Sequence, residues 1–193
     1  MMAEFEKSIA VSGTHGKTTV TSLLSSVFNA ANADPTVMVG ANLKAIGGNY
    51  CLGKSAYAVY EACEYVNSFH HFFPNCAIIL NIDEDHLDFF KDLDDVKDSF
   101  RRFALRVPQD GVVVANYDDA VNRIVTDSLG VEKITVPDVE GVPYDLEQDD
   151  NYYLSLPLNQ SPALVVLVAP SVRMYATLFK YLNVDNMHQT YMT

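Results

Sequence analysis

The residues best suited to chemistry stand in one short stretch, Gly13-Thr14-His15-Gly16-Lys17-Thr18-Thr19. Its glycines let backbone N–H groups turn inward, its lysine can reach the terminal phosphates of a nucleotide, and the next hydroxyl can coordinate Mg²⁺. Only two residues separate Gly13 from Gly16, whereas the common phosphate-binding loop has four residues before its Gly-Lys pair. The stretch predicts a phosphate-binding loop of unusual spacing. The plainer alternative is a glycine turn that happens to contain a lysine.

The segments on either side of this stretch favour the phosphate-binding interpretation. Ile9-Ala10-Val11 is an apolar run typical of a buried strand. After the loop, apolar residues recur at the three- and four-residue steps of one helix face: Val20, Leu23, Leu24, Val27 and Phe28. A helix that starts directly after a glycine loop offers its positive N-terminal end to a phosphate. We therefore expect the seven residues of the loop, Gly13 to Thr19, to bind a nucleotide.

Two further apolar runs end in polar residues. Tyr57-Ala58-Val59-Tyr60 runs into Glu61, and Cys76-Ala77-Ile78-Ile79-Leu80 runs into Asn81. Such continuous apolar runs are typical of strands buried on both faces of a parallel sheet, and ligands bind at the carboxyl ends of such strands. Glu61 and Asn81 should therefore lie beside the loop, where Glu61 is placed to hold Mg²⁺. The competing interpretation of Glu61 is an exposed loop carboxylate.

A second candidate metal ligand follows in Asn81-Ile82-Asp83-Glu84-Asp85-His86-Leu87-Asp88. A neighbouring carboxylate could fix the tautomer of His86 and so prepare the ring for a metal. Cys63 also stands near His70 and His71, but their spacing matches no usual zinc pattern, so we do not predict a zinc site there.

The rest of the chain continues the alternation of strands and helices. We expect strands at 36–39, 112–115 and 134–136, helices at 96–104 and 118–129, and a loop over 40–53. This order predicts an α/β fold with a doubly wound, mostly parallel sheet. Beyond residue 137, the runs 152–158 and 164–168 flank Asn159-Gln160-Ser161-Pro162 and predict a C-terminal β-hairpin, followed by a helix near 175–182.

Composition limits the class of protein. The 193 residues are 49% hydrophobic and 20% charged, as in soluble globular proteins of one or two domains. A net charge of −12 argues against a nucleic-acid partner, and no apolar run approaches the roughly 18 residues of a membrane span. The N-terminus lacks a signal core, and the odd set Cys51, Cys63 and Cys76 fits reduced thiols, so we expect a cytoplasmic protein.

The loop resembles the ATP-binding loop of the Mur ligases, which build the peptide of bacterial cell walls. Further segments resemble that family in the same order: Glu61-Ala62-Cys63-Glu64-Tyr65, Ser68-Phe69, and the 81–88 segment. The loop histidine and the Glu-Ala-x-Glu segment are most similar to the branch that adds L-alanine to UDP-N-acetylmuramate. The likeness runs from about residue 9 to about residue 129 and is weaker beyond.

This resemblance implies an ATP-driven amide ligation. The γ-phosphoryl group of ATP would pass to the carboxylate of UDP-N-acetylmuramate, and the amine of L-alanine would displace phosphate from the acyl phosphate. By position, Lys17 would bind the phosphates, Thr18 and Glu61 the first Mg²⁺, and His86 the second, while Asn81 would order the nucleotide. Lys17 and His86 are thus the implied catalytic residues.

The sequence also departs from the pattern of the family it resembles. Residues 1–193 correspond to the central ATP-binding domain, and we expect the family's UDP-binding and amino-acid-binding domains to be absent. Pro170-Ser171-Val172-Arg173-Met174 stands where the family has Pro-Gly-x-His-Asn beside the adenine. Three hypotheses follow: a central domain inactive alone, a folylpolyglutamate-type ligase, which the 61–69 segment opposes, and a non-catalytic nucleotide-binding or interaction module.

Overall fold

A computed structural model describes residues 5–116, 119–130, 133–136 and 164–168 of the chain. The strands are β1 (Lys7–Ser12), β2 (Thr36–Leu43), β3 (Gly48–Cys51), β4 (Tyr57–Glu61), β5 (Cys76–Ile79), β6 (Val112–Asn116), β7 (Lys133–Val136) and β8 (Leu164–Val168). The α-helices are α1 (Lys17–Ala30), α2 (Leu93–Ala104) and α3 (Ala120–Asp127), and the 3-10 helices are η2 (Lys44–Ile46) and η3 (Tyr65–His71).

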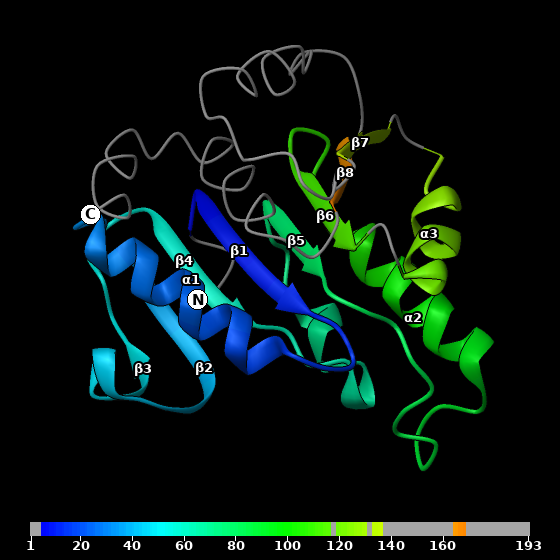
Figure 1. The fold of residues 1–193 in the computed structure, drawn as a ribbon, viewed down its shortest axis with the longest axis horizontal. Coiled ribbons are helices and arrows are strands. Elements are labelled where there is room, and N and C mark those ends of the chain that lie inside the picture. Colours follow the sequence, from blue (N-terminus) through cyan, green and yellow to red (C-terminus); the bar gives the residue numbers. More distant parts are fainter. Residues whose placement is uncertain (1–4, 117–118, 131–132, 137–163, 169–193) are drawn as a thin grey trace, which may run out of the picture.

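The strands form one eight-stranded sheet in the order β3-β2-β4-β1-β5-β6-β8-β7 (Figure 1). Each neighbouring pair is parallel except β2 and β3, which are antiparallel. This arrangement confirms the predicted α/β fold with a mostly parallel sheet. None of the helices among the described residues is both long enough and apolar enough to cross a membrane.

The central strands are buried on both faces, as their continuous apolar runs predicted. In β1, Ile9 and Val11 pack with Leu24 and Phe28 of α1, whereas Ala10 belongs to the cluster on the opposite face. That second cluster contains aromatic side chains from η3 and α2: Phe69, Phe100 and Phe103. Helices therefore cover both faces of the sheet (Figure 1). The packing of α1 against β1 fixes the start of this helix directly after the loop that follows β1.

Two predictions about local structure were wrong. Residues 40–53 are not a loop, because β2 continues to Leu43 and returns through η2 into the antiparallel edge strand β3. The exposed residues of this hairpin lack the apolar alternation that would have indicated strands. The run 164–168 is not one arm of a β-hairpin, because β8 lies between β6 and β7 and is parallel to both. Residues 152–158, 170–174 and 175–182 lie outside the described residues.

Candidate nucleotide-binding site

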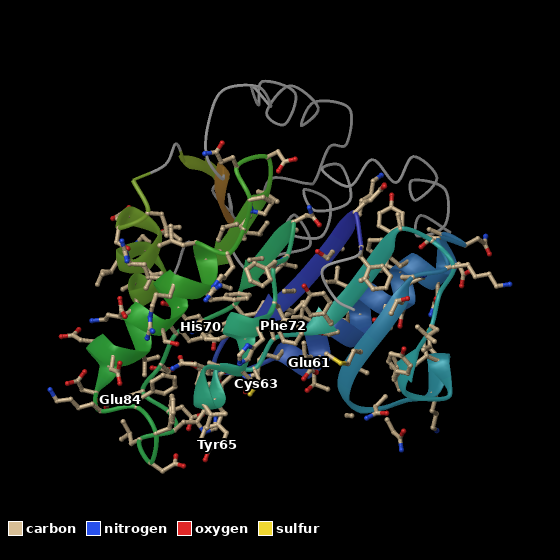
Figure 2. The ribbon with its side chains drawn as sticks, turned by 180° about the vertical axis from the view of Figure 1, so that it is seen from behind. Glu61, Cys63, Tyr65, His70, Phe72 and Glu84 are labelled. Carbon is tan, nitrogen blue, oxygen red and sulfur yellow. The ribbon has the colours of Figure 1, made fainter. Side chains whose placement is uncertain are left out.

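The carboxyl ends of β1, β4 and β5 meet at one edge of the sheet. Val11 pairs with Glu61, and Ser12 pairs with Ile79, so the glycine loop, Glu61 and Asn81 all leave the sheet at this edge. Figure 2 shows Glu61 at the end of β4, with Cys63 following it along the same edge. The glycine loop, Glu61 and Asn81 thus share one edge of the sheet, as expected from the carboxyl ends of parallel strands.

The two glycines of the loop have backbone conformations that other residues rarely adopt. Gly13 has a φ of +136° and Gly16 a φ of +86°. A Cβ atom on Gly13 would lie 3.0 Å from the Leu80 Cβ and 3.1 Å from the Asn81 N. Gly13 is therefore required both for the turn and for the close approach to the segment after β5.

Backbone and side-chain hydrogen bonds tie the loop to the segment after β5. The Thr14 N–H donates to the Asn81 carbonyl at 3.0 Å, and the Asp83 N–H donates to Thr14 Oγ1 at 2.9 Å. The side chain of Asn81 accepts from the His15 N–H at 2.8 Å and donates to the His15 carbonyl at 3.0 Å. Asn81 therefore orders the loop itself.

Lys17 begins α1 and folds back over the loop. Its Nζ donates to the Gly13 carbonyl at 2.6 Å, to the Thr14 carbonyl at 3.1 Å and to Glu64 Oε1 at 3.0 Å. Glu64 Oε2 lies 2.9 Å from the same nitrogen but is buried and accepts no hydrogen bond of its own. The side chain of Lys17 is 15% exposed and that of Glu64 only 2%, so this ion pair is largely out of water.

Sequence reasoning gave Glu64 no role, although it stands in the Glu61-Ala62-Cys63-Glu64-Tyr65 segment. The chain leaves β4 after Glu61, and Glu64 stands directly before η3. This short connection places the Glu64 carboxylate against Lys17 of the loop. The only sequence signal for it was a second glutamate three residues after the first.

His86 lies on the other side of Glu64. Its Nε2 is 3.7 Å from Glu64 Oε1 and 4.0 Å from Asp85 Oδ2, and its ring is 4.6 Å from that of Tyr65. The structure therefore brings Lys17, Glu64 and His86 into one cluster, with the carboxylate between the two basic groups.

Glu61 has a different environment from Glu64. Its Oε2 lies over β2, only 2.6 Å from the position that a Cβ atom on Gly40 would occupy. Its Oε1 is buried and has no hydrogen-bond partner in the described structure. A buried carboxylate oxygen without a partner suits a cation.

No group of three or more His, Cys, Asp or Glu side chains that could hold a metal ion occurs among the described residues. A Mg²⁺ ion at this edge would therefore draw its remaining ligands from phosphate and water, as Mg²⁺ in nucleotide sites commonly does. The residues present fit such an ion. The three cysteines are free, and the exposed Cys63 forms no such group with His70 or His71. His70 instead points its Nε2 to the Ser99 carbonyl at 2.9 Å, and burial lowers its pKa.

The N-terminus of α1 differs from those of the other two α-helices. Asp92 caps α2 by accepting from the Asp95 N–H, and Asp119 caps α3 by accepting from the Asn122 N–H. Gly16 caps α1 without any side-chain hydrogen bond, and the first turn of α1 carries no acidic residue. The α1 N-terminus thus keeps its N–H groups and its positive dipole end available for an anion.

Residues 11–153 match the model of the Mur ligase middle domain. The chain belongs to the Mur ligase family. The chain is 57% identical over 119 residues to the UDP-N-acetylmuramate--L-alanine ligase of Caldicellulosiruptor saccharolyticus, an alignment that covers 62% of the chain and 26% of that relative. It is 51% identical over 135 residues to the ligase of the same name from Alkaliphilus metalliredigens, covering 70% of the chain and 29% of that relative. The chain thus spans under a third of the length of these curated relatives.

Solved structures show the same relationship. The Mur ligase chain resembles the UDP-N-acetylmuramate-alanine ligase of Thermotoga maritima with a TM-score of 0.57 and 30% identity, over 64% of the chain and 28% of that protein. It resembles the UDP-N-acetylmuramate:L-alanyl-gamma-D-glutamyl-meso-diaminopimelate ligase from Neisseria meningitides with a TM-score of 0.60 and 28% identity, over 64% and 43% respectively.

Proposed function

We propose that this Mur ligase chain is the ATP-binding part of a ligase that joins L-alanine to UDP-N-acetylmuramate. One observation carries the nucleotide part of the proposal: the glycine loop leads into the N-terminus of α1, which has no side-chain cap, and places Lys17 at its entrance. Lysine, inward backbone N–H groups and a helix N-terminus are the groups that hold nucleotide phosphates.

The proposed reaction needs little covalent chemistry from the protein. Phosphoryl transfer depends mainly on positioning and on neutralising charge. Lys17 would bind the terminal phosphates, Thr18 and Glu61 would hold one Mg²⁺, and His86 would serve a second. When bound, Mg²⁺ would neutralise phosphate charge. Asn81 would keep the loop in shape through its two bonds to His15.

The identity of the acceptor and of the amine rests on the relatives. The proteins from Caldicellulosiruptor saccharolyticus and Alkaliphilus metalliredigens bear the name UDP-N-acetylmuramate--L-alanine ligase. The proposed steps are transfer of the γ-phosphoryl group of ATP to the carboxylate of UDP-N-acetylmuramate and displacement of phosphate from that acyl phosphate by the amine of L-alanine. The first step releases ADP and the second releases inorganic phosphate.

We further propose that a polypeptide of these 193 residues binds nucleotide but does not complete the ligation. The relatives are three to four times as long as the segment they share with it, judged from the 26% and 29% coverage. The carboxylate must be held in line with the γ-phosphate, and binding energy from remote parts of a substrate supplies much of that alignment. A coupled assay with ATP, UDP-N-acetylmuramate and L-alanine should detect no ligation product. Product formation at an ordinary enzymatic rate would contradict this proposal.

A second function, a nucleotide-binding or interaction module without any ligase role, is favoured by one sequence observation. Pro170-Ser171-Val172-Arg173-Met174 lacks the glycine, histidine and asparagine that the family has at the adenine. Adding the purified remainder of a relative to the coupled assay separates the two functions, because only a ligase part should restore product.

Calorimetric titration with Mg-ATP tests the nucleotide site. Lys17→Ala removes a charge-assisted bond to the phosphates and should weaken binding by more than about tenfold, or about 1.4 kcal/mol. Lys97→Ala is the matched control, because Lys97 pairs with Asp94 on the surface of α2 and its loss changes the net charge equally. Equal affinities for wild type and Lys17→Ala would refute the proposed site.

A further inference from the structure

The ammonium group of Lys17 has no donor left for a phosphate. A lysine has three N–H donors, and Nζ already donates to the Gly13 carbonyl, the Thr14 carbonyl and Glu64 Oε1. A phosphate oxygen can therefore bond to Lys17 only when one of these acceptors is released. Two of them are neutral carbonyls of the loop, whereas Glu64 is a carboxylate that competes with phosphate for the same charge.

When Lys17 releases Glu64, water cannot solvate the carboxylate in its place. Its side chain is 2% exposed, and a buried carboxylate without a partner is strongly unfavourable. One of its oxygens, Oε2, is already buried without accepting a hydrogen bond. Among its described neighbours the next basic group is His86, whose Nε2 is 3.7 Å from Oε1. A released Glu64 therefore needs another cation.

We propose that Glu64 is a positioning residue that holds Lys17 over the nucleotide-free loop and opposes phosphate binding until a divalent cation arrives with the nucleotide. This inference rests on the proposed nucleotide site. Through Glu64, the affinity for the nucleotide would depend on whether the cation is bound. Glu61 does not share this role, because its carboxylate lies over Gly40 of β2, where a Cβ atom would be 2.6 Å from its Oε2.

If Glu64 opposes phosphate binding, removing its charge should strengthen the binding of metal-free nucleotide, whereas most substitutions in a binding site weaken it. Glutamine has nearly the same shape and keeps an acceptor for Lys17, but it neither repels phosphate nor holds the ammonium by charge. Glu64→Gln should therefore bind metal-free nucleotide more tightly than wild type. A residue with a merely structural role would give equal or weaker binding when altered.

The test is calorimetric titration of ADP into the 193-residue chain, first in EDTA and then in excess Mg²⁺. Without metal, Glu64→Gln should bind ADP at least about threefold more tightly than wild type. The gain in affinity on adding Mg²⁺ should be smaller in the variant than in wild type. Glu84→Gln is the matched control, because Glu84 is an exposed carboxylate of the same edge (Figure 2) and its loss should leave the affinity at the wild-type value.

Thermal unfolding of each variant shows whether it is folded, and Glu64→Ala provides the same loss of charge if the glutamine variant is not. Metal-free affinity in the neutral variant that is no higher than in wild type would overturn the inference, as would an equal increase in Glu84→Gln. Failure of the nucleotide site itself gives a different result: wild type and Lys17→Ala would then bind ADP equally weakly in Mg²⁺.

Discussion

The side-chain amide of Asn81 pairs with the backbone of His15 through two hydrogen bonds, accepting from the N–H at 2.8 Å and donating to the carbonyl at 3.0 Å. The pair connects the end of β5 to the middle of the glycine loop. A loop held in this way keeps its N–H groups in position before any ligand binds, which lowers the entropy cost of binding.

Replacing Asn81 should loosen the loop without removing a phosphate contact. Asn81→Ala loses both hydrogen bonds to His15, which we expect to cost about 1–2 kcal/mol of unfolding free energy. Nucleotide affinity should fall severalfold, because the loop must then be ordered on binding. Urea unfolding and calorimetry measure the two effects. The control is Asn49→Ala on the exposed edge strand β3, and a similar loss of affinity there would refute the role given to Asn81.

The close approach at Gly13 gives a second prediction. Gly13→Ala adds a methyl group about 3.0 Å from Leu80 in a backbone conformation with φ of +136°, so the loop must shift. Gly47→Ala is matched for a positive φ of +70°, but nothing lies within 4 Å of its Cβ. We expect about 1 kcal/mol of destabilisation at Gly47 and at least about 2 kcal/mol at Gly13. Equal values from denaturant unfolding would show that the contact with Leu80 does not constrain the loop.

A third prediction concerns the stability of the Lys17–Glu64 ion pair. Lys17→Met leaves Glu64 as a buried, unpaired carboxylate and should lower the unfolding free energy by on the order of 2 kcal/mol. Adding Glu64→Gln removes that unpaired charge and should recover most of the loss. A double-mutant cycle measured by denaturant unfolding isolates the interaction. Additive effects of the two substitutions would mean that the pair contributes nothing to folding.

Much of this fold followed from local pattern. The apolar runs at Ile9-Ala10-Val11 and Cys76–Ile79 marked strands buried on both faces, and the three-and-four spacing from Val20 to Phe28 marked α1. Since the carboxyl ends of parallel strands share one edge, the meeting of the glycine loop, Glu61 and Asn81 could be predicted as well.

Three features could not be predicted from the sequence: the contact of Glu64 with Lys17, the edge strand β3 and the place of β8 in the sheet. Glu64 reaches Lys17 because the short connection between β4 and η3 passes beside the loop, and no residue pattern in Glu61-Ala62-Cys63-Glu64 signals that path. Strand β3 has no buried residue, so its sequence lacks the apolar alternation that indicates a strand. The position of β8 between β6 and β7 is a long-range pairing, and local spacing carries no information about it.

The central claim, that nucleotide phosphates bind between β1 and α1, is tested most directly by NMR titration of the ¹⁵N-labelled chain with Mg-ADP. We expect the largest shifts in the backbone amides of Gly13, Gly16 and Thr18 and in the side-chain amide of Asn81. The amide of Asn49 on β3 should stay unchanged. No shift in the loop, or larger shifts on α3 than in the loop, would contradict the claim.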